Sequence, residues 1–173
     1  MQNDRYGNQS GYGNRYSGQS RQMNQQRPGI RADAVQSVAR KTAHEKLTEE
    51  NYVLLADKAI TALCNNKDRF GNPSIVSTSK IRNLLAMSAD IYNDVVTSLN
   101  EELSAEVKGR INYLKIRMIY EAGREETIKK FLDESDLTNH IDDINGSRRQ
   151  FILFNHYMEA LVAYRKFYVK EKE

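Results

Sequence analysis

The chain has 173 residues, with 26 Lys and Arg against 23 Asp and Glu, one cysteine, two prolines and a mean hydropathy of -0.72. This length suits one domain plus an appendage, because independent domains most often have about 100–150 residues. No apolar run reaches the roughly 18–20 residues that a membrane span needs, and the start lacks the apolar centre of a signal peptide. We therefore expect a cytoplasmic protein with no membrane partner.

The cysteine and histidine content argues against two classes of small protein. Cys64 is the single cysteine, so it cannot form an internal disulfide. Together with His44, His140 and His156 it makes no recognisable zinc-binding spacing. We expect no metal and no other cofactor.

The first 31 residues differ in composition from the rest. They contain five Arg and one acidic residue, so they carry +4, whereas the remaining 142 residues sum to -1 within a net charge of +3. A segment of Gln, Asn, Gly, Ser, Arg and Tyr cannot bury enough apolar surface to offset an ordering cost of about 1–2 kcal/mol per residue. We predict a disordered basic tail over 1–31, a linker or marginal helix over 32–47 and a helical domain over 48–173. Interleaved Arg and Tyr suit single-stranded nucleic acid, although a solubilising extension is the simpler interpretation.

From residue 48 onward, apolar residues recur with a helical period of 3.6 residues, and no alternating segment indicates a strand. Thr48 and Ser147 are the expected N-caps, the latter in a capping box with Gln150, and Gly123 is the expected residue after a third helix that begins at about Ser104. The predicted fold is all-α, a compact bundle of about five to six helices with a disordered basic N-terminal tail. The expected helices begin near 48 and 77 and then cover 104–122, 125–134, 138–145 and 148–169.

The third predicted helix carries apolar residues on two flanks. Val107, Ile111, Leu114 and Met118 form the main stripe, and Ile116, Ile119 and Tyr120 form the second. A helix that is apolar on both flanks is expected in the centre of a bundle.

Catalytic motifs are scarce in this sequence. It contains no Gly-rich phosphate loop, nucleophile elbow or His-Glu-x-x-His motif, and we predict that the protein is not an enzyme. Five acidic residues surround His140 and could in principle hold Mg²⁺ or act as acid and base, but capping and solvation of helix ends is the favoured interpretation. We interpret His156 as a satisfied groove residue and Cys64 as a small apolar filler. The acidic residues are Asp133, Glu134, Asp136, Asp142 and Asp143.

The third helix also carries alternating Arg and Tyr. Spacings of three and four residues place these side chains along one side of the helix, with Lys108 and Lys115 across the apolar stripe. Such a ladder can pair phosphates and stack bases. Alternatively, the tyrosines belong to the core and the arginine stems pass over them, and spacing alone favours neither interpretation. The ladder consists of Arg110, Tyr113, Arg117, Tyr120 and Arg124.

Further cations lie near the starts of two helices. Lys80 and Arg82 follow the predicted start of the second helix, where backbone amides also favour phosphate. Arg148 and Arg149 begin the last helix, where they oppose the helix dipole, so an external anion is the better explanation for them.

Three blocks of the sequence resemble a known family. The residues SKIRNLL at 79–85, YLKIR followed by YEAGR within 113–124, and YMEALVAYR at 157–165 are similar to the small helical subunit of the type III-A CRISPR effector, the Csm complex. The similarity covers about residues 48–170.

The resemblance implies a non-catalytic subunit that takes part in antiviral defence. It implies several stacked copies, contacts with other subunits of the Csm complex, and contacts with the backbones of guide RNA and target RNA, while cleavage belongs to other subunits. The matching blocks supply six candidate RNA contacts, and the charge argument alone supplies three more, all expected along one wall of the bundle. The first six are Lys80, Arg82, Lys115, Arg117, Arg124 and Arg165, and the other three are Arg110, Arg148 and Arg149.

Two other functions compete with this one. The first is a helical protein-interaction module whose Arg-Tyr ladder contacts another protein and no nucleic acid. The second is a metal-dependent nuclease that uses the acidic residues near His140.

Overall fold

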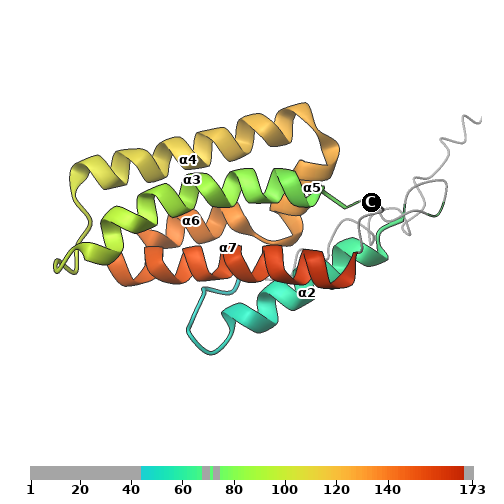
Figure 1. Cartoon of the computed structure of the whole chain (residues 1–173), viewed down its shortest axis with the longest axis horizontal. Helices are drawn as coiled ribbons and strands as arrows, with labels where there is room; N and C mark the ends of the chain where they lie inside the picture. Colours follow the sequence, from blue (N-terminus) through green and yellow to red (C-terminus); the bar gives the residue numbers. More distant parts are fainter. Residues whose placement is uncertain (1–43, 68–70, 72–74, 170–173) are drawn as a thin grey trace, which may run out of the picture. The chain divides into compact units, whose positions relative to one another are not determined.

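The computed structural model describes residues 44–67, 71 and 75–169, and these residues form an all-α fold (Figure 1). Within them there are no strands, and an isolated bridge joins Glu102 and Ser147. The fold class is therefore confirmed. The predicted tail over 1–31, most of the linker and the turn at Asn72 and Pro73 lie outside the described residues. The helices are α2 (Tyr52–Asn65), α3 (Thr78–Thr97), α4 (Ala105–Arg124), α5 (Glu126–Glu134), α6 (Leu137–Ile144) and α7 (Arg148–Tyr168).

Serine side chains start the two helices α4 and α7, close to the predicted positions. The Ser104 hydroxyl accepts a hydrogen bond from the Val107 amide at 3.2 Å, and the Ser147 hydroxyl accepts one from the Gln150 amide at 3.3 Å. The Gln150 side chain donates to the Leu47 carbonyl instead of returning to Ser147, so only half of the predicted capping box forms.

Two helix ends differ from the prediction. Helix α2 begins at Tyr52, and Thr48 instead exchanges hydrogen bonds of 2.7 and 3.2 Å with Asn51 across the preceding turn. Helix α4 continues through Gly123 to Arg124, because the extended backbone that ends it lies at Glu125. Glu125 also starts α5, so one residue makes the corner between the two helices.

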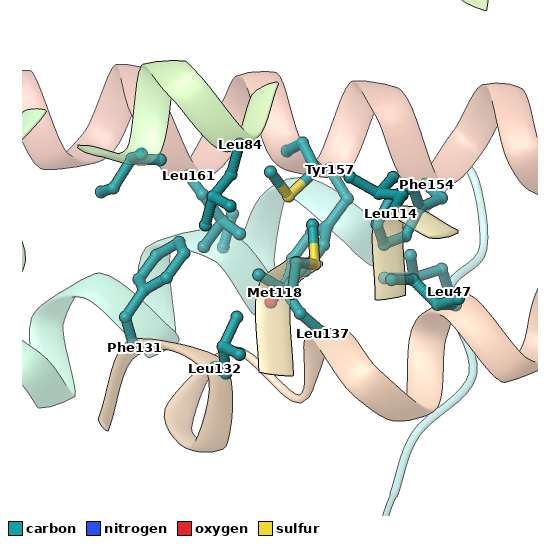
Figure 2. Packing of buried hydrophobic residues seen from close by; sticks show 14 of the residues in the cluster. Leu47, Leu84, Leu114, Met118, Phe131, Leu132, Leu137, Phe154, Tyr157 and Leu161 are labelled. Atoms are coloured by element: carbon teal, nitrogen blue, oxygen red, sulfur yellow. The ribbon is translucent and has the colours of Figure 1, made fainter. Parts of the chain in front are cut away.

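Helix α7 is the central element of the bundle. It packs against α2, α3 and α6, and its Phe151, Phe154, Met158 and Leu161 side chains are fully buried. Figure 2 shows Phe154, Tyr157 and Leu161 among core residues from other helices, including Leu114 and Met118 of α4. None of the described helices is both long and apolar enough to cross a bilayer.

Helix α4 is peripheral, which corrects the expectation that it is central. It packs against α3, α5 and α6 and lies beside α3 in Figure 1. Ile111, Leu114 and Met118 are buried as predicted, but Ile116, Ile119 and Tyr120 are exposed. The second apolar flank of this helix therefore faces away from the core.

Two polar contacts are built into the core around α7. The Ser88 hydroxyl of α3 donates to the Asn155 side-chain oxygen at 2.9 Å, and the Tyr157 hydroxyl donates to the Ser135 carbonyl at 2.9 Å. Burial accordingly raises the pKa of the Tyr157 phenol. These bonds fix α7 against α3 and against the turn between α5 and α6.

Candidate nucleic-acid interface

The Arg-Tyr ladder of α4 forms a surface, and its tyrosines do not belong to the core. Tyr113 is 59% exposed and Tyr120 is 53% exposed. The guanidinium carbons of Arg117 and Arg124 lie 5.6 and 5.5 Å from the centre of the Tyr120 ring. Cations at this distance are attracted to an aromatic ring, so two guanidinium groups and one phenol ring are held together on the surface.

Carboxylates accompany the ladder but are fewer than its arginines. Arg110 forms an ion pair with Asp94 of α3. Arg117 and Arg124 share Glu121, at 3.3 and 3.8 Å. Ion pairs between exposed side chains stabilise a protein by only about 0–1 kcal/mol, and a guanidinium has five donors. The three arginines therefore keep a surplus of positive charge and free donor capacity.

Lys80 joins this surface from α3. Lys80, Arg117 and Glu121 line one hollow whose apolar wall comes from α3 and α5. Lys80 forms an ion pair with Glu125 at the corner between α4 and α5. The structure thus brings four of the nine predicted cations together, and we name this group the α4 strip: Lys80, Arg110, Arg117 and Arg124.

Three predicted cations lie elsewhere. Arg82 is exposed, but it follows Lys80 by two residues and so points about 200° away around the helix axis. Lys115 pairs with Asp142 of α6 at 2.6 Å, and Arg149 pairs with Glu49 at 2.7 Å. The prediction of a single basic wall is therefore wrong for these three positions.

Arg148 and Arg165 bind backbone carbonyls within the protein. The Arg148 guanidinium donates to the carbonyls of Val95 and Val96 at 3.0 and 2.9 Å, so it caps the C-terminus of α3 and needs no external anion. Arg165 is only 4% exposed and donates to the Val76 carbonyl at 2.8 Å. This geometry argues against an RNA contact by either residue, and neither belongs to the α4 strip.

An apolar surface on α4 accompanies the basic one, and the sequence interpretation missed it. Ile116 is 61% exposed and Ile119 is 52% exposed. A Cβ atom added at Gly109 or Gly123 on the same face would meet nothing within 4 Å. The signal was present as the second apolar flank, but it was assigned to the core. We name Ile116 and Ile119 the α4 apolar patch.

A cluster of histidines and carboxylates lies at α6, away from the α4 strip. His44 Nε2 lies 2.8 Å from Asp143 Oδ2, and His44 Nδ1 contacts Asp136 Oδ2. Asp136 occupies the N-cap position of α6 but forms no side-chain cap hydrogen bond, so the capping interpretation is wrong for this residue. The hydrogen bond with Asp136 raises the pKa of His44, whereas burial lowers the pKa of His140 to about 4.

The remaining candidates pack as predicted. Cys64 is half-buried against the core, and burial raises the pKa of its thiol. The His156 ring lies 6.3 Å from that of Tyr52 and 6.0 Å from that of Tyr92, centre to centre. Both residues have packing roles.

Comparison with known proteins decides the family. The model of the family described as Csm2 Type III-A matches residues 57–171. The chain belongs to this Csm2 family. This family match confirms the resemblance to the small helical subunit of the type III-A CRISPR effector.

Individual Csm2 proteins agree with the family match. The "CRISPR system Cms protein Csm2" of Streptococcus thermophilus is 38% identical over 122 residues, which cover 70% of this chain and 94% of that protein. The protein of the same name from Mycobacterium tuberculosis (strain CDC 1551 / Oshkosh) is 32% identical over 119 residues, covering 69% of this chain and 92% of the relative. The similarity to Csm2 therefore extends over nearly the whole of these relatives.

Proposed function

We propose that this member of the Csm2 family, a structural subunit of a type III-A CRISPR complex, contacts the backbones of guide and target RNA through the α4 strip. The observation that carries the proposal is the exposure of Tyr113 and Tyr120 between arginines on the outer side of α4. Had these rings been buried, the arginines would be the solvated edge of a core helix. Their exposure leaves both the charges and the rings available to a polyanion.

The geometry of α4 fits a strand that lies along the helix. Arg110, Arg117 and Arg124 follow one another at intervals of seven residues, which corresponds to a rise of about 10.5 Å each. Each guanidinium can pair a phosphate, and the intervening phenol rings can stack on bases or hydrogen-bond to sugars. The protein needs no base-specific contacts, because pairing with the guide reads the sequence.

Stacking of copies compensates for the small number of cations in each copy. The body outside residues 1–31 has a net charge of -1, so one copy offers only a few phosphate contacts. Copies in a row raise the affinity, because each bound copy holds the strand near its neighbour. In this proposal, the α4 apolar patch contributes to the contact between copies or with another subunit of the complex, and RNA cleavage takes place on other subunits.

Charge reversal on the α4 strip tests the proposal. Arg117→Glu and Arg124→Glu, each assembled into the full complex, should weaken target-RNA binding. They should also make the fall of the association constant with salt shallower. The magnitude of the slope of log K against log salt concentration should decrease by about 0.7 for each lost phosphate contact. Lys166→Glu on α7 is the matched control, because Lys166 is exposed, carries the same charge and lies on a helix that does not pack against α4. Unchanged affinity and slope in both α4 variants contradict the proposal.

One second function is favoured by a specific observation. Exposure of Ile116 and Ile119 suits a protein-interaction module that makes no nucleic-acid contact. Pull-down of the complex separates the two functions. If Ile116→Asp abolishes recovery of partner subunits while the arginine variants and nuclease treatment change nothing, the protein-interaction function is correct and the RNA contact is not.

A further inference from the structure

His44 and two residues of the α6 region, Asp136 and His140, offer ligand atoms close together. His44 precedes α2, Asp136 is the N-cap of α6, and His140 lies within α6. One ligand atom from each lies within 4.8 Å of the other two. Imidazole nitrogen and carboxylate oxygen form the mixed donor set that suits Zn²⁺ and related transition metals, whereas Mg²⁺ prefers oxygen ligands alone.

His140 supplies an independent reason to expect a ligand. The residue is only 3% exposed, and its Nδ1 is buried without a hydrogen-bond partner among the described residues. Its ring also packs edge-on against Tyr157, with the centres 5.1 Å apart. A buried polar atom without a partner is costly, and such atoms in native proteins usually have a specific explanation. A coordinated cation beside the ring provides one.

We propose that His44, Asp136 and His140 bind a divalent transition-metal ion of the zinc class. His44 Nδ1 faces Asp136 and would be the metal ligand, while His44 Nε2 faces Asp143. A carboxylate on the second ring nitrogen is the usual partner of a metal-binding histidine, because it fixes the tautomer and the ring orientation. Asp143 therefore has a positioning role.

A fourth coordination position is available on the pocket side of the cluster. Asp136 and His140 line this pocket together with Glu45, Glu134 and Tyr157. A water molecule or a carboxylate from this wall can complete four-coordinate geometry.

The consequence of the site is structural. His44 and Asp136 are separated by 92 positions in the chain, and His44 lies in the segment before α2. An ion bound here would tie this segment to α6, and its binding free energy would add to the stability of the folded state. The family model match begins at residue 57, so this tie uses a residue outside the matched region.

Metal content and thermal stability of the full chain, freed of any affinity tag, test this proposal. Protein stripped with chelator and then dialysed against Zn²⁺ should retain a single ion per chain and melt at a higher temperature than the stripped protein. Co²⁺ in place of Zn²⁺ should give the intense visible absorption of a tetrahedral site. Asp143→Asn should lower the affinity for Zn²⁺ by about 10–100-fold.

The decisive variants are at the exposed His44 and the half-buried Asp136, because removal of the buried His140 would also leave a cavity. His44→Ala and Asp136→Asn should lose both the retained ion and the gain in melting temperature. His156→Gln is the matched control, since it removes a histidine outside the cluster. The proposal is overturned if the wild-type chain retains no more Zn²⁺ than His44→Ala, or if His156→Gln loses as much metal as His44→Ala.

Discussion

Helices α4 and α7 are nearly equal in length, with 20 and 21 residues, yet they relate to the core in opposite ways. Helix α7 is surrounded by α2, α3 and α6 and buries residues on several sides. Helix α4 buries three residues and exposes Tyr113, Ile116, Ile119 and Tyr120. Neighbouring exposed apolar residues on a helix face often mark an interaction surface. The comparison teaches that α7 holds the fold together, whereas the outer face of α4 is available for contacts outside the chain.

The largest expected effect concerns the core side of this comparison. Phe154→Ala on α7 should lower the free energy of unfolding by about 3–5 kcal/mol, because the ring is fully buried and its loss leaves a cavity. Ile116→Ala on α4 should change the same quantity by about 0.5 kcal/mol or less. Urea unfolding of the two variants measures both values. Similar losses of stability in the two variants would contradict the conclusion that α7 holds the core together while this face of α4 does not.

A buried cation on α7 gives the next largest effect. Arg165→Ala should lower the free energy of unfolding by about 1–3 kcal/mol, because the Val76 carbonyl loses its buried donor. The salt dependence of RNA binding by the assembled complex should stay as in the wild type. Loss of RNA affinity without loss of stability would instead indicate that Arg165 contacts RNA.

The N-cap serines of α4 and α7 allow the starts of the two helices to be compared by mutation. Ser104→Ala and Ser147→Ala each remove an observed hydroxyl acceptor, and each should cost about 1 kcal/mol of stability. Thermal unfolding measured by circular dichroism gives both values. Ser104→Thr and Ser147→Thr, which keep the acceptor, are the controls and should recover most of the loss.

The smallest effect on stability is expected on the outer face of α4. Ile116→Ser should change the free energy of unfolding by about 0.5 kcal/mol or less, because the side chain is already 61% exposed. It should nevertheless reduce association with further copies or with partner subunits. Analytical ultracentrifugation of the chain and recovery of the complex measure this effect. Normal association in both measurements would show that the α4 apolar patch is not an interface.

Helix positions and caps were predictable because they depend on neighbours within one or two turns. Helices α3, α4 and α7 begin close to the expected positions, Ser104 and Ser147 accept the capping hydrogen bonds, and the apolar period located all of the described helices. The end of α4 was predicted wrongly, and the misleading signal was a single residue within the helix. Gly123 suggested a helix end, but the backbone turns two residues later at Glu125.

The candidate site was predictable only in part. The spacing of Arg110, Arg117 and Arg124 placed them on one side of α4, and the structure keeps them there. The Arg148 guanidinium donates to carbonyls 52 and 53 positions away, and Arg165 Nε donates to the Val76 carbonyl 89 positions away, which no pattern along one helix reveals. Long-range packing therefore places these two residues outside the α4 strip.

The sequence by itself determined the all-α class, the starts of α3, α4 and α7, the Arg-Tyr ladder and the family likeness. Only the tertiary structure decided that α7 rather than α4 is central, that Tyr113 and Tyr120 are exposed, and that His44 meets Asp136 and His140. The physical reason is the separation along the chain over which each kind of interaction acts. Helical period and capping act between residues a few positions apart, whereas burial and ion pairing depend on which distant segments the packed core brings together.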